Sequence, residues 1–275
     1  MKRLLQAFLY LIATAISLVF VYPFYWMVIS SFRSQEAIFS RPLALLPEGF
    51  DLSAWRSIGR LGGVDLWSYV FNSLFITLAA TSLGVATTAL GAYALWRQPK
   101  LPLFPTVQYS FLLTIMYPNM LLVIPLYFVT YYLGLLGTYF GIILSITIVP
   151  LVFFIFIQFF RTIPKELLDA AEVDGAGEFQ TFRRVVMPIA APILTTAFLI
   201  AWLLNWKQWF QILVISTKPD TYTLPVALLQ LNSEYGVNFQ ATMALAALTS
   251  VPVIVLFILT QRKVMSGFLA GAVKG

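Results

Sequence analysis

Residues 165–188 read KELLDAAEVDGAGEFQTFRRVVMP and form the longest polar interruption in this apolar chain. The stretch holds five of the eleven acidic residues and lies between two strongly apolar segments. Charged helical turns around a glycine, placed between membrane-spanning segments, predict a surface that is exposed to water. We interpret this segment as a docking surface for a soluble component.

The composition places the chain in a lipid bilayer. Of the 275 residues, 60% are hydrophobic and 10% are charged, against roughly 25% charged in an ordinary soluble domain. The chain has no Cys and no His, which excludes thiolate and imidazole metal sites, disulfides and His-based acid/base catalysis. The net charge of +6 is spread over loops, a pattern that membrane topology explains better than nucleic-acid binding.

Six apolar runs are long enough to cross a hydrocarbon core, which needs about 20 residues each. They cover residues 4–31, 67–96, 103–132, 138–160, 189–215 and 241–260. The first run is too long for a signal-peptide core, so we expect a retained span. The sequence therefore predicts an all-α integral membrane protein with six transmembrane helices and a single domain over residues 1–275.

The distribution of Lys and Arg predicts the orientation. Eleven of these residues fall on the side that holds both termini and residues 164–188, and five fall on the other side. The side richer in Lys and Arg is usually cytoplasmic. We therefore expect both termini and the charged segment to face the cytoplasm.

The acidic residues bear on the source of energy, because all eleven lie outside the six predicted spans. Carriers coupled to protons usually need a titratable group at membrane depth, and sodium coupling often uses one too. A membrane-embedded enzyme would likewise need a catalytic constellation that this chain hardly supplies. A gradient-driven carrier or a channel for small polar solutes remains the alternative to a pump driven by another subunit.

Lys207 is the one ionisable side chain that falls within a predicted span, in the run NWKQWFQ from Asn205 to Gln211. Two interpretations remain open: Lys207 lines a ligand site with the amide and indole groups beside it, or it snorkels to the membrane surface. Prolines such as Pro118 and Pro150 permit broken helices along an aqueous path, although ordinary helix packing is the alternative. The candidate substrate-path residues are Tyr117, Asn119, Asn205, Trp206, Lys207, Gln208 and Trp209.

The charged segment has a predictable local structure. Pro164 fits the first turn of a helix, and Glu166 and Asp169 favour its positive N-terminal end. We expect this helix to run to about Val173, followed by a turn at Asp174–Gly175 and a second helix from about Glu178 that ends ahead of Pro188. The segment is then either a rigid peg that fits a partner's socket or an amphipathic loop on the lipid headgroups.

Asp169-Ala170-Ala171, followed by Gly175, Val185 and Met187-Pro188, resembles the EAA signature of the permease subunits of binding-protein-dependent ABC importers. Asp169 stands where Glu is usual, Val185 replaces Ile and Met187 replaces Leu. The similarity continues in MYPNMLLVIPLYFVTYYLGLLGTYFGIIL (116–144) and TQRKVMSGFLAGAVKG (260–275) and covers most of the chain. These segments are similar to the carbohydrate branch of the family, specifically its maltose-type shorter permease subunit.

This resemblance implies the type I importer permease fold, with a cytoplasmic coupling helix between spans 4 and 5 that docks in a groove of an ATPase subunit. The implied coupling residues are Glu166, Asp169, Ala170, Ala171, Asp174, Gly175, Ala176 and Arg184. The tail Gly271–Gly275 would extend toward the ATPase pair. Where relatives have WN followed by an acid, this chain has Trp206-Lys207-Gln208, so the charge of the ligand stays open.

The implied partners are a second permease subunit, two ATPase subunits, an extracytoplasmic solute-binding protein and a carbohydrate substrate, in a bacterial or archaeal cytoplasmic membrane. The sequence contains no G-x-x-x-x-G-K-[ST] loop, so ATP hydrolysis belongs to another subunit. We expect no cofactor or metal on this chain, with ATP and Mg²⁺ on the ATPase subunits. Transport would proceed by alternating access.

Overall fold

The computed structural model describes residues 2–42, 44–46, 49–234 and 238–272. Helices make up most of this part of the chain, as the composition predicts. The chain forms two compact units, which we call unit 1 (Met1–Tyr69 with Ala227–Pro252) and unit 2 (Val70–Val226 with Val253–Gly275). The expectation of a single domain stays a prediction. The side chains of Gly271–Gly275, the expected contact tail, lie outside the described part.

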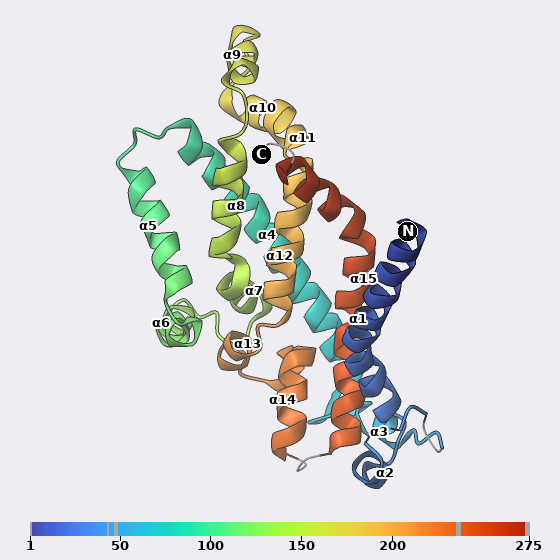
Figure 1. Ribbon diagram of the computed structural model, residues 1–275. Coiled ribbons are helices and arrows are strands. Elements are labelled where there is room, and N and C mark those ends of the chain that lie inside the picture. The colour runs from blue at the N-terminus through green and yellow to red at the C-terminus, as the bar shows by residue number, and fades with distance from the viewer. Residues whose placement is uncertain (1, 43, 47–48, 235–237, 273–275) are drawn as a thin grey trace. The chain divides into compact units, whose positions relative to one another are not determined.

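The long and short helices follow one another along the chain with few other elements between them (Figure 1). In chain order the elements are α1 (Lys2–Ser30), α2 (Gln35–Ser40), α3 (Ser53–Ser57), β1 (Arg60–Leu61), β2 (Val64–Asp65), α4 (Leu66–Arg97), α5 (Leu103–Met116), α6 (Asn119–Tyr132), α7 (Tyr139–Thr147), α8 (Pro150–Phe160), α9 (Lys165–Val173), α10 (Glu178–Thr181), the π-helical turn η1 (Phe182–Val186), α11 (Met187–Ile189), α12 (Ala191–Trp206), α13 (Phe210–Ile215), the 3₁₀ turn η2 (Pro219–Thr221), α14 (Leu224–Glu234) and α15 (Phe239–Ala272).

Unit 1 contains α1 and the short elements that follow it. Strands β1 and β2 pair antiparallel, and Gly62 and Gly63 turn the chain between them with φ angles of 52° and 80°, which glycine adopts without strain. The Arg33 side chain is only 2% exposed. It donates hydrogen bonds to the carbonyl oxygens of Ala37 at 2.5 Å and Arg41 at 2.7 Å, two acceptors at the C-terminal end of α2.

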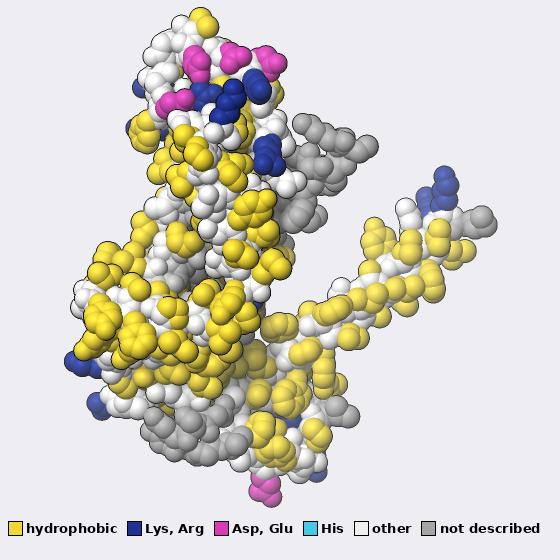
Figure 2. Space-filling view, turned by 90° about the vertical axis from the view of Figure 1, so that its left-hand side faces the viewer, with side chains coloured by type: hydrophobic (Ala, Val, Ile, Leu, Met, Phe, Trp, Pro, Cys, Tyr) yellow, Lys and Arg dark blue, Asp and Glu magenta, His cyan; other side chains and the backbone are white. Residues whose placement is uncertain are grey.

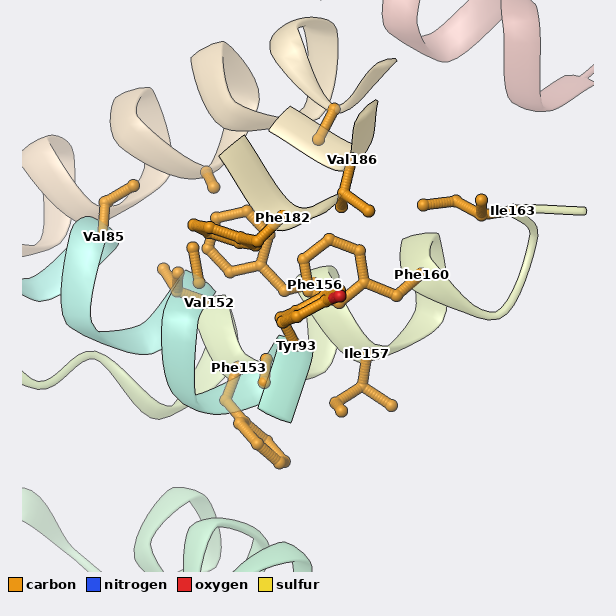
Figure 3. Close-up of a cluster of buried hydrophobic side chains, with 14 of the residues drawn as sticks. Val85, Tyr93, Val152, Phe153, Phe156, Ile157, Phe160, Ile163, Phe182 and Val186 are labelled. Atoms are coloured by element: carbon orange, nitrogen blue, oxygen red, sulfur yellow. The ribbon is translucent and has the colours of Figure 1, made fainter. Parts of the chain in front are cut away.

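Unit 2 has a core built around α8, which packs against α5 and α12. Figure 3 shows the rings of Tyr93, Phe156, Phe160 and Phe182 packed together within this core. The ring centroids of Tyr93 and Phe182 are 5.0 Å apart, a spacing at which aromatic pairs attract. Because Tyr93 belongs to α4 and Phe182 to η1, the cluster fixes the charged segment to the apolar helices.

Three helices are each long and apolar enough to cross a membrane by themselves within the described residues: α1, α4 and Phe239–Gln261 of α15. Bent helix pairs raise this number to as many as six if each pair forms one span. The bends are 116° between α5 and α6, 48° between α7 and α8, and 82° between Glu178–Ile189 and α12. The first two pairs correspond to the predicted runs 103–132 and 138–160, which are therefore not straight helices, whereas the third pair joins the charged segment to the start of the run 189–215.

Proline explains two of the interruptions. Tyr117 precedes Pro118, Val149 precedes Pro150, and both preceding residues are extended, with ψ angles of 137° and 102°. The proline ring disfavours helical backbone in the residue before it. The break between α12 and α13 at residues 207–209 differs, because it contains neither proline nor glycine. An apolar run over 189–215 predicts an uninterrupted helix there, so this break has no such sequence signal.

The helix expected to end ahead of Pro188 continues past it, which corrects that prediction. Helical backbone runs through α10, η1 and α11 to Ile189. The amide of Met187 donates to the carbonyl oxygen of Phe182, a wider π-type turn. A proline normally clashes with the carbonyl one turn earlier, and a π bulge just before it relieves that conflict. The helix ends at Ile189, and Ala190 separates it from α12.

Candidate functional site

The charged segment forms a helix, a tight turn and a second helix, as its sequence predicts. Helix α9 ends in a Schellman motif: the amide of Ala176 donates to the carbonyl oxygen of Ala171 at 2.9 Å, and that of Gly175 to Glu172 at 3.0 Å. Gly175 has a φ of 76°, in the left-handed region that this motif requires. These hydrogen bonds define the conformation of the turn that connects α9 and α10.

An ionic cluster fixes the turn to α4. The guanidinium of Arg97 at the end of α4 pairs with Glu172 of α9 and, at 2.9 Å, with Glu178 of α10. The hydroxyl of Tyr93, one turn earlier in α4, donates to Glu178 at 2.7 Å. Hydrogen bonds from Arg97 and then from Tyr93 lower the pKa of the Glu178 carboxyl below its ordinary value. The guanidinium of Arg97 thus joins both helices of the segment to α4, through Glu172 of α9 and Glu178 of α10.

The surface of this segment carries charge of both signs. Figure 2 shows acidic and basic side chains gathered at the top of the view, where Figure 1 places α9 and α10. Among the predicted coupling residues, most are exposed: Glu166, Asp169, Ala170, Asp174, Gly175 and Arg184. Ala176 is half-buried, whereas Ala171 is buried within this chain, as is Leu168. The exposed surface of α9 therefore combines Glu166, Asp169 and Ala170 with the apolar side chains of Leu167 and Val173, and the side chain of Ala171 is buried.

A second candidate site is a cavity of about 330 Å³ in unit 2, which we call the polar cavity. An adjoining cavity of about 360 Å³ shares Thr114, Asn119, Ser145 and Gln211 with it. The polar side chains that line the polar cavity are Thr114, Tyr117, Asn119, Ser145, Asn205, Gln208 and Gln211. Within the described residues, neither cavity is lined by a charged side chain.

The polar cavity is lined by residues from three helix interruptions of unit 2: α5–α6, α7–α8 and α12–α13. Tyr117 lies at the α5–α6 break, Ile148 and Val149 form the α7–α8 break, and Gln208 lies at the α12–α13 break. Helix α13 packs against both α6 and α7, which brings the breaks together (Figure 1). Interrupted helices inside a bilayer are tolerated where they line a polar space, because their freed backbone groups need partners. They are also common at transporter binding sites.

The seven predicted substrate-path residues do not all line the polar cavity. Tyr117, Asn119, Asn205 and Gln208 line the polar cavity. Trp206 is 5% exposed and stacks on Trp202, with ring centroids 4.8 Å apart, and Trp209 packs on a neighbouring apolar cluster. Lys207 is exposed and does not line either cavity.

The sequence prediction missed three polar lining residues, of which Gln211 is the most buried, with 7% exposure. A signal for it was present, since the amide of Gln211 interrupts an apolar stretch and is followed by four apolar residues. Thr114 and Ser145 have no comparable signal, because hydroxyl residues in membrane helices commonly bond to their own backbone. Both do so here, to Ser110 and Ile142.

The polar cavity and the charged helical turn belong to the same unit, and both fall in a part of the chain that matches a known protein family. Residues 88–265 match the family described as the binding-protein-dependent transport system inner membrane component. This chain belongs to that family. The matched range contains both the polar cavity and the charged segment. Together with its long apolar helices, membership identifies the chain as a multi-pass membrane protein and a permease of the ABC importer class.

Curated relatives align with nearly the whole permease. The diacetylchitobiose uptake system permease protein DasC of Streptomyces coelicolor is 30% identical over 93% of this chain and 92% of its own. The arabinooligosaccharides transport system permease protein AraQ of Halalkalibacterium halodurans is 30% identical over 94% and 93%. The trehalose transport system permease protein SugB of Mycobacterium tuberculosis is 34% identical over 84% and 85%.

A solved structure supports the fold. The permease resembles a chain in the crystal structure of a bacterial ABC transporter involved in the import of the acidic polysaccharide alginate, with a TM-score of 0.79. The two chains are 22% identical, and the alignment covers 95% of this chain and 96% of the other. At this identity the likeness establishes a common fold, which is that of an importer permease.

Proposed function

We propose that this permease is the membrane subunit of an ATP-driven importer that moves a carbohydrate across the cytoplasmic membrane. The names of the similar permeases support the substrate class, since they refer to diacetylchitobiose, arabinooligosaccharides and trehalose. The single observation that carries the proposal is the polar cavity at the three helix breaks. Its amide and hydroxyl groups are suited to a ligand rich in hydroxyl groups.

The charged segment would transmit the energy of ATP hydrolysis. Its acidic face is exposed, while Arg97, Glu172 and Glu178 join it to α4. A rigid projection held in this way can pass a partner's movement to the helices beside it. The proposed partner is a pair of ATPase subunits that bind ATP and Mg²⁺, so that this chain itself catalyses no reaction.

The remaining partners follow from the same assignment. A second permease subunit would complete the transport path, and an extracytoplasmic solute-binding protein would deliver the ligand. The excess of Lys and Arg on the side of residues 164–188 supports a cytoplasmic position for that segment and for both termini. ATP binding would draw the two coupling segments together and change the side to which the cavity opens.

A gradient-driven carrier is the second candidate. Such carriers commonly hold a carboxylate or His at membrane depth. The polar cavity has neither among its lining residues, which favours the ATP-driven mechanism.

Reconstitution separates the two candidates. Proteoliposomes that contain this chain, its partner permease and the ATPase subunits should accumulate a sugar only with internal ATP and an external loaded binding protein. Proton and sodium ionophores should leave uptake unchanged. Uptake by this chain without ATPase subunits, abolished by those ionophores, would refute the proposal.

A further inference from the structure

Another cavity of unit 2, of about 460 Å³, lies where α4 ends, α5 begins and α8 ends. We call it the basic cavity. These three helix ends all lie toward the end of unit 2 that carries α9 (Figure 1). The lining includes two aromatic side chains, three cations and one carboxylate: Trp96, Phe104, Arg97, Arg161, Lys165 and Asp169.

The basic cavity lies at the depth of the lipid headgroups. Helix α4 is long and apolar enough to cross the membrane, and Arg97 is its last residue. The bent pair of α7 and α8, which counts as another span, ends at Phe160. Span ends lie where the hydrocarbon core meets the headgroups, a depth at which Trp is enriched. Trp96 lies there, with its ring centroid 5.7 Å from that of Phe160.

Two cations of this cavity are available to an external anion. The guanidinium of Arg97 is already paired with Glu172 and Glu178. Arg161 directly follows α8, and Lys165 is the first residue of α9. Both are exposed, and neither side chain forms a hydrogen bond or an ion pair with another described residue. Their charges are therefore not neutralised by direct contact within the described part of the chain.

We propose that the basic cavity binds the phosphate group of an anionic phospholipid. Arg161 and Lys165 donate charge-assisted hydrogen bonds to the phosphate oxygens, and Trp96 and Phe104 contact the glycerol and the upper acyl chains. Basic pockets between membrane helices are typical sites for acidic lipid headgroups. The proposal needs only the membrane location of the chain and does not depend on the transported substrate.

The aromatic side chains favour a lipid over an acidic surface of a partner protein. A soluble partner approaches from the water, whereas Trp96 and Phe104 belong to the ends of apolar helices and pack against the core of unit 2. Asp169 is the one carboxylate among the described lining residues, and it opposes any anion. A lipid bound by Arg161 and Lys165 would join the first turn of α9 to the end of α8.

Photolabelling of the intact transporter tests the proposal. The complex of this chain, its partner permease and the ATPase subunits is placed in phosphatidylcholine nanodiscs that contain increasing fractions of photoactivatable phosphatidylglycerol. Labelling of peptides from residues 96–104 and 161–169 should saturate, and a photoactivatable phosphatidylcholine should label them far less. The double variant Arg161→Gln/Lys165→Gln should raise the half-saturating fraction about thirtyfold, as expected for two surface cations.

Matched variants separate a binding site from general attraction to the membrane. Arg183→Gln/Arg184→Gln removes the same charge at exposed positions outside the basic cavity and should leave half-saturation close to wild type. Asp169→Asn removes the opposing carboxylate and should lower the half-saturating fraction. Because all five positions are exposed, melting temperatures should stay close to wild type. Soluble glycerol 3-phosphate, compared with sodium chloride at equal ionic strength, should not displace the lipid.

Four results would overturn the proposal. Equal labelling by phosphatidylcholine would show that charge is not recognised, and unchanged half-saturation in Arg161→Gln/Lys165→Gln would exclude these two cations. Displacement by glycerol 3-phosphate would identify a site for a soluble phosphate. If the wild type is not labelled in these peptides and the double variant loses its ATPase subunits on gel filtration, the two cations bind a partner protein instead.

Discussion

Gly175 sets the shape of the charged segment through one backbone angle. Its φ of 76° closes the Schellman motif at the end of α9, and no heavy atom would lie within 4 Å of an added Cβ. A substitution therefore meets backbone strain and no clash within this chain. Glycine is required at this position by its positive φ angle and not by lack of space. The turn could be predicted because an Asp-Gly pair favours this conformation.

Replacing Gly175 with Ala should cost about 1–2 kcal/mol of local stability, the usual penalty for a left-handed non-glycine residue. Gly175→Leu should in addition obstruct docking, so ATPase stimulation by loaded binding protein should fall while membrane insertion persists. The matched control is Gly177→Ala, since Gly177 has a φ of −71° and equally open surroundings. Stimulation equal to wild type in Gly175→Leu would contradict a coupling role for the turn.

Gly84 is required because α4 and α7 approach each other closely at this position, and not because of its backbone conformation. A Cβ at this position of α4 would overlap the carbonyl oxygen of Thr147 at the end of α7. Gly84→Ala should destabilise unit 2 by about 1–3 kcal/mol, as overpacking does, and lower the melting temperature of the purified complex. Gly91→Ala, in the same helix with nothing within 4 Å of an added Cβ, should be neutral or stabilising. Equal melting temperatures for the two variants would show that this close approach does not occur.

At the scale of elements, the sequence predicted helices better than their interruptions. Pro118 and Pro150 signal two breaks, because proline restricts the residue before it. The break after Trp206 has no local signal, and it depends on how α13 packs against α6 and α7. The continuation of helix past Pro188 was likewise hidden, since a π turn has no simple sequence pattern. Four of the seven polar residues that line the cavity were among the predicted candidates, and Gln211 was not, although its amide group stands in an apolar stretch of the sequence.

The ionic cluster of α4, α9 and α10 should behave as one unit. Glu178→Gln removes the charge but keeps an acceptor for the buried Tyr93 hydroxyl, so it should cost about 0.2–1 kcal/mol, as for an exposed ion pair. Glu178→Leu should cost more, because the Tyr93 hydroxyl also loses its side-chain acceptor. Glu166→Gln, at an exposed residue with no described partner, is the control. Thermal unfolding of the purified complex measures all three, and equal losses for Gln and Leu would exclude the Tyr93 contribution.

The same carboxylate predicts a dependence on pH. Because Arg97 holds the pKa of Glu178 below its ordinary value, the stabilisation is complete above the ordinary Glu pKa of about 4.3. It is lost as the pH falls through the lowered pKa. The difference in melting temperature between wild type and Glu178→Gln should therefore be constant near neutral pH and shrink on acidification. A difference that grows on acidification would contradict this assignment.

At the scale of the whole molecule, the orientation in the membrane can be tested directly because the chain has no cysteine. Val173 at the end of α9 is 87% exposed, and Lys218 lies in an exposed loop on the predicted external side. In intact cells a membrane-impermeant maleimide should label Lys218→Cys but not Val173→Cys. Both variants should react after the cells are opened. External labelling of Val173→Cys would reverse the predicted topology.

The three interruptions around the polar cavity have a consequence for how long a ligand stays. Backbone groups released at a break take water as a partner when no sugar is present. An entering sugar therefore exchanges one set of hydrogen bonds for another, with a net gain of about 0.5–1.5 kcal/mol for each. Because the lining formed by the described residues has no charged side chain, a sugar bound there would form no ion pair with it, and its residence would be brief. Contacts of this strength would let the permease accept its cargo and release it with similar ease.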